Sequence, residues 1–299
     1  MKTRLLWLPI FLISAIVFYA CQKELNDQSS AEVPQGKQQV SLYLTDGPAL
    51  FDSVLIDLQK VEVLVDTCKK SDNDDDDDDD HHGDHHGDDD RDNRHNDDTC
   101  KVWVDMQIAP GQYDLLSLRN GVDTLLANGN VPAGTVKKVK ISLGTNNQLV
   151  KDSVRYPLRL FPGAGSTIII NFKHEDWDHY SDRRCRVWLD FDVARSIVVV
   201  RNNEFFLRPV VRPFVVARTG SVEGKVVPDS AFAVISVYNS SDTAYALPNY
   251  KGEFKIRGLK AGEYNMFINA SNGFADSTIT GLKIEAGKPK KLPTIVLHK

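Results

Sequence analysis

Cysteine and helical patterning are both scarce in this sequence. Only four of its 299 residues are cysteine, which excludes a small scaffold held together by many disulfide bonds. Beyond residue 37, no ten-residue segment repeats its apolar side chains at the 3.6-residue period of a capped helix. Apolar types still make up 41% of the chain, so we expect a folded protein with a core rather than a wholly disordered one.

Glutamate is absent from one strongly acidic segment. Residues 72–98, here named the Asp/His tract, hold fifteen Asp and two Arg but no Glu. The rest of the chain has 34 basic and 26 acidic residues, so the formal net charge of −5 averages a basic body with an acidic insert. Such an insert would repel phosphates, and we therefore expect no nucleic-acid partner.

Long apolar runs are also missing, apart from one near the start. Residues 5–20 follow a basic beginning and are apolar except at Pro9 and Ser14. These sixteen residues fall short of the roughly 20 that a bilayer-spanning helix needs. The pattern therefore predicts a secretory signal over residues 1–20.

The residue after this run is Cys21, and the pair Ala20-Cys21 resembles the acylation site of Bacteroidetes-type lipoproteins. The resemblance implies that Cys21 is lipidated and begins the mature chain, which the lipid anchors to a membrane. Gln22-Lys23-Glu24 resembles the export signal of outer-membrane surface lipoproteins. Residues 21–37 are polar and predict a flexible tether.

From residue 38 onward the dominant period is two, which predicts an all-β fold, most plausibly β-sandwiches. A change of phase near Gln59-Lys60 predicts a β-bulge. Apolar residues over 115–118, followed by Asn120-Gly121, predict a hairpin. Continuous apolar runs at residues 168–170 and 197–200 predict strands buried on both faces.

Residues 220–297 resemble the carboxypeptidase-regulatory-like domain, a seven-stranded transthyretin-like sandwich related in fold to starch-binding modules. The resemblance rests on Gly252-x-Phe254-x-Ile256-x-x-Leu259-x-x-Gly262-x-Tyr264, where apolar residues alternate between turn glycines. It implies a non-catalytic domain over residues 218–299. Short strands are expected at 221–227, 233–238, 252–256, 264–270 and 292–297.

Residues 38–217 resemble the domain of unknown function 4382 family of bacterial lipoproteins, with an insert at residues 69–99. The resemblance brings no known activity. It rests on separated matches in the right order: residues 44–48 (LTDGP), 51–54 (FDSV), 113–118 (YDLLSL), 132–134 (PAG) and 189–198 (LDFDVARSIV).

The Asp/His tract has the ligand types that divalent cations use. Crowded carboxylates suit Ca²⁺, and neighbouring imidazoles suit Zn²⁺. The order of residues does not match the Ca²⁺-binding loop pattern, since His82 stands where Asp or Asn belongs. Two interpretations stay open: a solvated, disordered loop, or a metal site. The candidate ligands are Asp74, Asp76, Asp78, Asp80, His81, His82, Asp84, His85, His86 and Asp88.

Cys68 and Cys100 bracket this insert, and a hairpin formed by the strands beside them would bring the two sulfurs within bonding reach. We favour a Cys68–Cys100 disulfide. The pairs Cys68–Cys185 and Cys100–Cys185, or three free thiols, remain alternatives.

Motifs of known catalytic chemistry do not stand out. His174 and His179 are spaced wrongly for a zinc protease, and their segment is interpreted as a polar hairpin loop with Trp177 exposed. The glycines at 163–165 lack the lysine of a phosphate-binding loop. Trp103, Trp177 and Tyr180 could stack on a sugar, but sandwich surface or core explains them equally well.

These observations favour a non-enzymatic, outer-membrane-anchored surface lipoprotein of two β-sandwiches that acts as a binding or structural module and requires no cofactor. One alternative is a surface protein that sequesters divalent metal with the Asp/His tract. Another is a carbohydrate-binding accessory protein. The partners expected are the membrane and a glycan or protein ligand.

Overall fold

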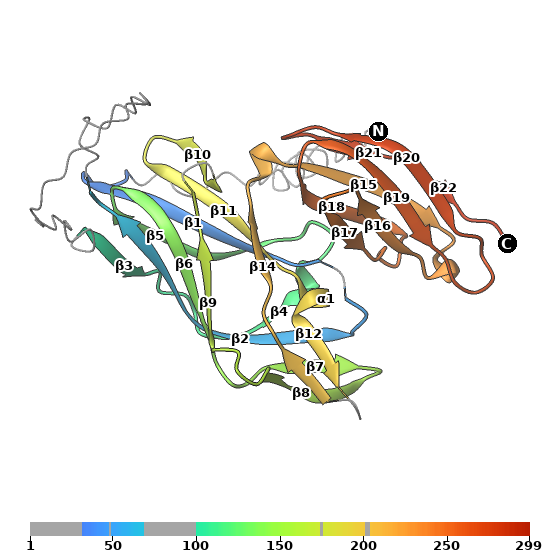
Figure 1. The fold of residues 1–299 in the computed structure, drawn as a ribbon, viewed down its shortest axis with the longest axis horizontal. Coiled ribbons are helices and arrows are strands. Elements are labelled where there is room, and N and C mark those ends of the chain that lie inside the picture. Colours follow the sequence, from blue (N-terminus) through green and yellow to red (C-terminus); the bar gives the residue numbers. More distant parts are fainter. Residues whose placement is uncertain (1–31, 48, 69–99, 174–175, 201–203) are drawn as a thin grey trace, which may run out of the picture. The chain divides into compact units, whose positions relative to one another are not determined.

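The computed structural model describes residues 32–47, 49–68, 100–173, 176–200 and 204–299. Residues Gln35–Lys299 form one compact unit, separate from Met1–Pro34. Its regular structure is almost entirely β (Figure 1), which confirms the all-β prediction. Within the described ranges, no helix has both the length and the apolar character to cross a membrane.

A five-stranded sheet forms one layer of the first sandwich. Strands β1 and β11 pair in parallel at its centre, with Val40 opposite Cys185 and Leu44 opposite Leu189. These side chains point into the core because alternate residues of a strand face opposite sides. The strands are β1 (Lys37–Thr45), β5 (Thr124–Pro132), β10 (Asp178–Ser181), β11 (Arg184–Phe191) and β14 (Val211–Phe214).

A nine-stranded sheet forms the opposite layer, built around the long strand β2. Its register against β6 shifts between Leu58 and Lys60, so the predicted bulge is confirmed. The strands are β2 (Ser53–Asp66), β3 (Lys101–Asp105), β4 (Gly111–Asp114), β6 (Thr135–Leu143), β7 (Gln148–Lys151), β8 (Val154–Leu160), β9 (Thr167–Asn171), β12 (Ile197–Val200) and β13 (Glu204–Leu207).

Two predictions in this sandwich are wrong. Leu115–Leu118 is a 3-10 helix (η2), whose first turn is capped by the Asp114 carboxylate accepting from the Leu116 amide. All three of its leucines are buried, so this group of apolar residues packs into the core and does not form a hairpin strand. Neither the isoleucine run nor the valine run is buried on both faces: Ile169 is 53% exposed and Val199 is 60% exposed.

The second sandwich consists of two four-stranded sheets. Phe254, Ile256, Tyr264, Met266 and Ile268 all enter its core, as the sequence pattern predicts. One sheet contains β15 (Gly220–Val227), β18 (Glu253–Leu259), β21 (Pro289–Lys291) and β22 (Ile295–Val296); the other contains β16 (Val234–Tyr238), β17 (Thr243–Ala246), β19 (Gly262–Asn269) and β20 (Ser277–Ile284). Strands β17, β20 and β21 were not predicted.

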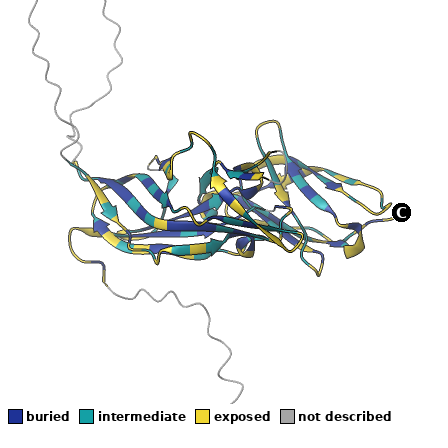
Figure 2. Ribbon diagram, turned by 90° about the horizontal axis from the view of Figure 1, so that it is seen from below, coloured by how far each residue is buried: buried dark blue, intermediate teal, exposed yellow. Residues whose placement is uncertain are grey.

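Each sandwich has its own hydrophobic core. One core draws its buried residues from positions 40–215 and the other from positions 222–297. Buried and exposed residues alternate along most strands (Figure 2). Short helical turns join some strands: α1 (Val193–Ser196), η5 (Val216–Arg218) and η6 (Asp229–Ala231).

Candidate site at the junction of the two sandwiches

The structure describes only some of the site residues that the sequence predicts. Cys68 and Cys100 are joined as a disulfide, with their Cα atoms 5.3 Å apart, at the ends of β2 and β3. Cys185 is buried as a free thiol. Burial raises the pKa of this thiol to about 12, so it is not a thiolate nucleophile at neutral pH. Cys21 and every candidate ligand in the Asp/His tract lie outside the described residues.

Trp177 is not exposed, contrary to prediction. Its side chain is only 2% exposed and packs on Phe172, with ring centroids 4.8 Å apart. The polar residues around Trp177 indicate an exposed loop. A single loop side chain can still turn back into the core, as this one does. Trp177 therefore offers no stacking surface to a sugar.

Trp103 and Tyr180 are each covered by a cation. Lys140 Nζ lies 4.3 Å from the centroid of the Trp103 ring, and Trp103 remains 39% exposed. The Arg186 guanidinium lies 4.5 Å from the centroid of the Tyr180 ring. Both rings are thus engaged in cation–π contacts on outer sheet faces.

A stack of aromatic rings covers the outer face of the five-stranded sheet. Tyr43, Trp188 and Phe214 stand opposite one another on β1, β11 and β14. The Tyr43 and Trp188 rings are 5.0 Å apart and nearly parallel, and the Trp188 and Phe214 rings are 6.2 Å apart. Although Trp188 faces away from its own core, it is only 7% exposed. Something outside this sheet must therefore cover it.

Arg257 of the second sandwich provides part of that cover, beside Arg186 of β11, whose guanidinium lies 5.3 Å from the Trp188 ring centroid. The Arg257 guanidinium lies 5.7 Å from the Trp188 ring centroid and 5.8 Å from that of Phe214. Its Nη1 atom donates to the Asp123 carboxylate at 2.7 Å and to the Gly121 carbonyl at 3.0 Å. Trp188 Nε1 donates to the same Asp123 oxygen at 2.8 Å. A planar guanidinium suits this role because it stacks and hydrogen-bonds at once.

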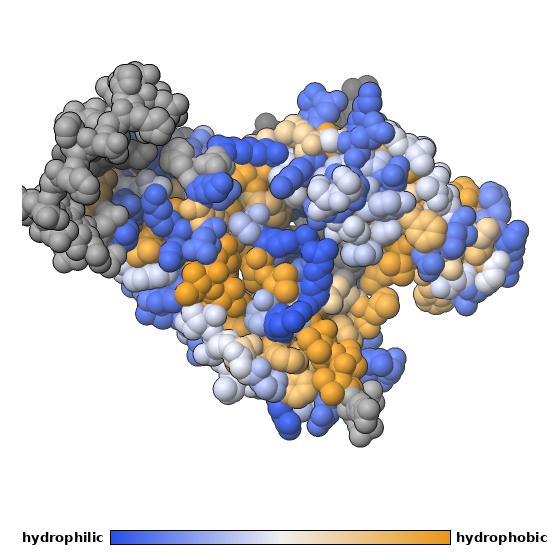
Figure 3. Space-filling model, viewed as in Figure 1, coloured by the Kyte–Doolittle hydropathy of each residue, from blue (hydrophilic) through white to orange (hydrophobic). Residues whose placement is uncertain are grey.

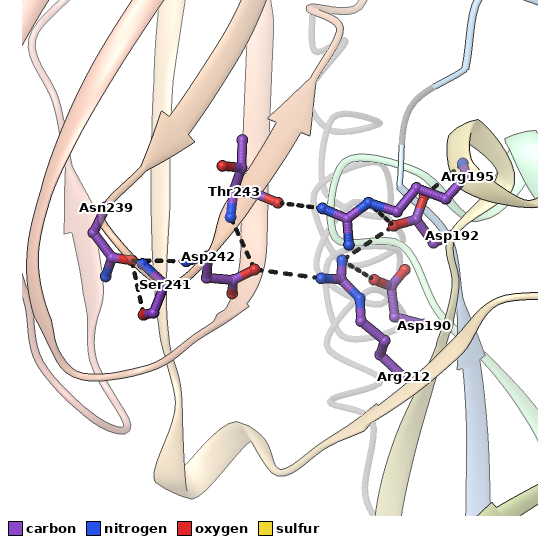
Figure 4. A network of polar contacts seen from close by, with 8 residues as sticks. All are labelled: Asp190, Asp192, Arg195, Arg212, Asn239, Ser241, Asp242 and Thr243. Carbon is purple, nitrogen blue, oxygen red and sulfur yellow. Dashed lines mark hydrogen bonds and ion pairs between the residues drawn. The ribbon is translucent and has the colours of Figure 1, made fainter.

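A second contact between the sandwiches is a network of carboxylates and arginines (Figure 4). Arg212 Nη2 lies 3.2 Å from an Asp190 oxygen and 3.4 Å from an Asp192 oxygen. Its Nη1 atom reaches Asp242 of the second sandwich at 3.5 Å. Arg195 pairs with Asp192 and donates to the Thr243 carbonyl at 3.3 Å. One guanidinium therefore links three carboxylates across the junction.

Asp46 is the least satisfied carboxylate of this region. It is 6% exposed, and its Oδ1 atom accepts from the Val193 amide at 3.2 Å. Its Oδ2 atom is buried with no hydrogen-bond partner among the described residues. Burial, and then the charge of Asp190, raise the pKa of Asp46 well above its usual range. Burial likewise raises the pKa of Asp190 to about 6, against the opposing effect of Arg212.

These carboxylates line a small cavity between the two sandwiches. Its volume is about 60 Å³, which is room for a few waters. The first sandwich contributes Asp46, Asp190, Asp192 and Arg212, and the second contributes Tyr245, Lys255 and Arg257. Three carboxylates and three cations therefore line it.

Sequence reasoning did not single out the residues of this junction. Trp188 and Asp190 alternate along the chain with the apolar Val187, Leu189 and Phe191, but no motif assigns them a role. The signal that could have found the junction was a tryptophan and two aspartates at the outward-facing positions of residues 188–192. An outer face that carries a large aromatic side chain needs a partner surface to cover it. Arg257, which sits in an ordinary strand pattern, carried no signal of its own.

Exposed apolar side chains lie in several patches separated by hydrophilic ones on the face seen in Figure 3. Single exposed apolar residues are normal on soluble proteins and need no partner. As a candidate site, the junction is therefore more specific than these apolar patches.

Comparisons with known proteins agree with the family expected from the sequence. The family described as domain of unknown function DUF4382 matches residues 37–209. The chain belongs to this family. No curated protein matches the chain.

Solved structures with some likeness include a cohesin–dockerin complex, the TIE protein and a pilin. A cohesin–X-dockerin complex from Acetivibrio cellulolyticus has 25% identity and a TM-score of 0.22, over 26% of this chain and 56% of that one. The Bacillus anthracis TIE protein has 12% identity and a TM-score of 0.24, over 88% and 35%. The Streptococcus agalactiae minor pilin GBS52 has 13% and 0.21, over 88% and 96%. The chain thus spans about half of the first structure, and scores this low support no functional conclusion.

Proposed function

We propose that this DUF4382 member is a non-enzymatic lipoprotein, anchored on the outer surface of the outer membrane, that acts as a binding or structural module. Its second sandwich, residues 218–299, is a carboxypeptidase-regulatory-like domain, and glycans or proteins are its expected partners. The observation that carries the proposal is the junction, where Arg257 of the second sandwich binds Asp123 of the first and Arg212 of the first binds Asp242 of the second. Such contacts hold two sandwiches as one body, which suits a displayed module.

The anchor is tested by replacing its acylation site. Cys21→Ala should move the protein from the detergent phase to the soluble fraction, because only the acyl chains hold it at the membrane. Cys185→Ala is the matched control, since Cys185 is a buried free thiol, and it should leave the partition unchanged. If the Cys21→Ala protein stays in the membrane, the lipoprotein assignment is wrong. Protease treatment of whole cells tests surface exposure, and full protection would contradict it.

Metal sequestration by the Asp/His tract is the second candidate function, favoured by the density of carboxylates and imidazoles between Cys68 and Cys100. Deleting residues 72–98 should abolish most binding of Zn²⁺, Ni²⁺ and Cu²⁺, since these prefer imidazole. Melting of both sandwiches should barely change. Titration calorimetry measures the binding, and unchanged Zn²⁺ uptake after the deletion would rule the tract out.

A further inference from the structure

A cleft of about 220 Å³, here named the apolar cleft, lies where the loop after η2 meets the second sandwich. It shares no lining residue with the cavity at the junction. Apolar side chains form most of its wall, among them Leu50 of the first sandwich and Phe232 and Leu247 of the second. Arg119 and Asp229 are the only charged residues among the described ones that line it.

Hydrogen bonds hold the walls of the apolar cleft in place. The Asn120 side-chain amide donates to the Leu247 carbonyl at 3.1 Å, which ties the loop after η2 to the second sandwich. The Val226 amide donates to the Gly252 carbonyl at 2.8 Å within the second sandwich. The cleft is thus formed before any partner binds, as ligand sites usually are.

Phe232 has two unfavourable features at once. Its φ of +41° and ψ of +51° place it in the left-handed region, which strains a bulky L-residue and suits glycine or asparagine. Its side chain is also 68% exposed. Backbone strain of this kind gathers at functional sites. An asparagine here would remove both the strain and the exposed ring, so the fold itself does not require a phenylalanine.

Leu50 adds a second exposed apolar side chain to the same cleft. It is 75% exposed, and among the large apolar side chains of the described residues only Tyr250 is more exposed than Leu50 and Phe232. Single exposed apolar residues are ordinary. Two on the wall of one cleft instead form a surface that a partner can bury.

Arg119 gives the apolar cleft a preference in charge. Arg119 is half-buried, and no described residue forms an ion pair with its guanidinium. Asp229 is exposed, so water and salt screen its charge. A cation that is partly removed from water gains more from a carboxylate than a fully solvated one does. The electrostatics therefore favour an acidic group beside the apolar wall.

The size and the lining of the cleft distinguish between kinds of occupant. Its volume of about 220 Å³ is below the range of roughly 300–1,000 Å³ that is typical of small-molecule sites, and it is room for one large side chain. A sugar ring needs hydrogen-bonding groups around its edge, whereas Arg119 and Asp229 provide the only polar side chains of the lining. Both observations favour a protein side chain over a glycan.

We propose that the apolar cleft receives one aromatic side chain from an extended segment of a protein partner, and that a neighbouring carboxylate of the same segment pairs with Arg119. The incoming ring packs against Phe232 and Leu50, and the guanidinium donates to the carboxylate. This inference rests on the proposed function as a binding module and names the class of partner. One anchored side chain gives weak binding, with a Kd of about 10⁻³ M.

The test uses N-acetyl-L-tryptophan, which has an aromatic ring and a carboxylate, as a probe of the purified full chain in saturation-transfer NMR. N-acetyl-L-tryptophanamide lacks the carboxylate and should bind about threefold more weakly or less. Arg119→Gln should abolish this difference between the two probes. Phe232→Asn should weaken both by about fivefold or more. Trp103→Asn is the matched control, since Trp103 is a partly exposed ring outside the cleft, and it should change neither.

Thermal melting of Phe232→Asn separates a binding role from a structural one. Asparagine tolerates the left-handed conformation, so this variant should melt at the temperature of the wild type or above it. A lower melting temperature would show that the ring supports the fold, and it would overturn the argument from strain.

The binding results can also overturn the proposal. Equal binding of N-acetyl-L-tryptophan by wild type and Phe232→Asn, or no binding by either, would exclude the cleft. Tighter binding of methyl β-D-glucopyranoside, lost in Phe232→Asn, would assign the cleft to a sugar. A dimer in sedimentation that Phe232→Asn abolishes would assign it to a second copy of the chain. The membrane partition of Cys21→Ala is independent of all these results, so failure here leaves the lipoprotein proposal standing.

Discussion

Gly252→Ala should lower the free energy of unfolding of the second sandwich by about 3–5 kcal/mol, because it combines backbone strain with a clash. Gly252 has a φ of +78°, which L-residues rarely adopt. A Cβ atom there would lie 2.2 Å from the carbonyl oxygen of Val226. That carbonyl belongs to strand β15, while the Val226 amide donates to the Gly252 carbonyl at 2.8 Å. The two backbones therefore cannot separate without breaking the sheet.

Gly273→Ala is the matched control for this prediction. Gly273 has nearly the same φ, +77°, but a Cβ atom there meets nothing within 4 Å. Gly273→Ala should lower the free energy of unfolding by only about 1 kcal/mol, because it adds backbone strain without a clash. Urea denaturation of both variants measures the difference. Equal losses would show that the close approach to Val226 is relaxed in solution and carries no energy.

Arg257→Ala should destabilise the chain by about 3 kcal/mol, because it removes one side chain from several contacts at once. Asp123 would lose its cation, and the Trp188 and Phe214 rings would lose one of the groups that cover them. Arg257 is 16% exposed in its ion pair, so water can replace it only in part. The free energy of unfolding in urea is the measurement.

Arg208→Ala is the control for the loss of an arginine, since Arg208 is exposed; it should change stability by less than about 0.5 kcal/mol. A double-mutant cycle with Asp123→Ala should give a coupling of about 1–3 kcal/mol. A coupling near zero would mean that the Arg257–Asp123 contact does not join the sandwiches.

The alternation of apolar residues predicted strands well wherever one face of a strand is buried. The bulge between Leu58 and Lys60 was predicted because a one-residue change of phase moves every later side chain to the other face of the sheet. The helix η2 was missed, since three leucines in four residues fit a strand, a helix or a turn equally well. Strand β17 was missed because its sequence, Thr243–Ala246, contains no β-branched apolar residue.

The junction could not be predicted from the sequence for a different reason. Arg257 and Asp123 are 134 positions apart in the sequence, and Arg212 of the first sandwich contacts Asp242 of the second. No local period or spacing encodes such pairs, since they depend on how two finished surfaces meet. Asp46 likewise lies in an ordinary turn motif, and only its burial distinguishes it.

Calorimetric melting of the intact chain and of Arg257→Ala tests most directly whether the junction holds the two sandwiches as one body. We expect one cooperative transition for the wild type, with equal calorimetric and van't Hoff enthalpies, because separate cores unfold together when their interface is strong. Arg257→Ala should split this into two transitions, one for each core. Two independent transitions already present in the wild type, unaffected by the substitution, would contradict the account.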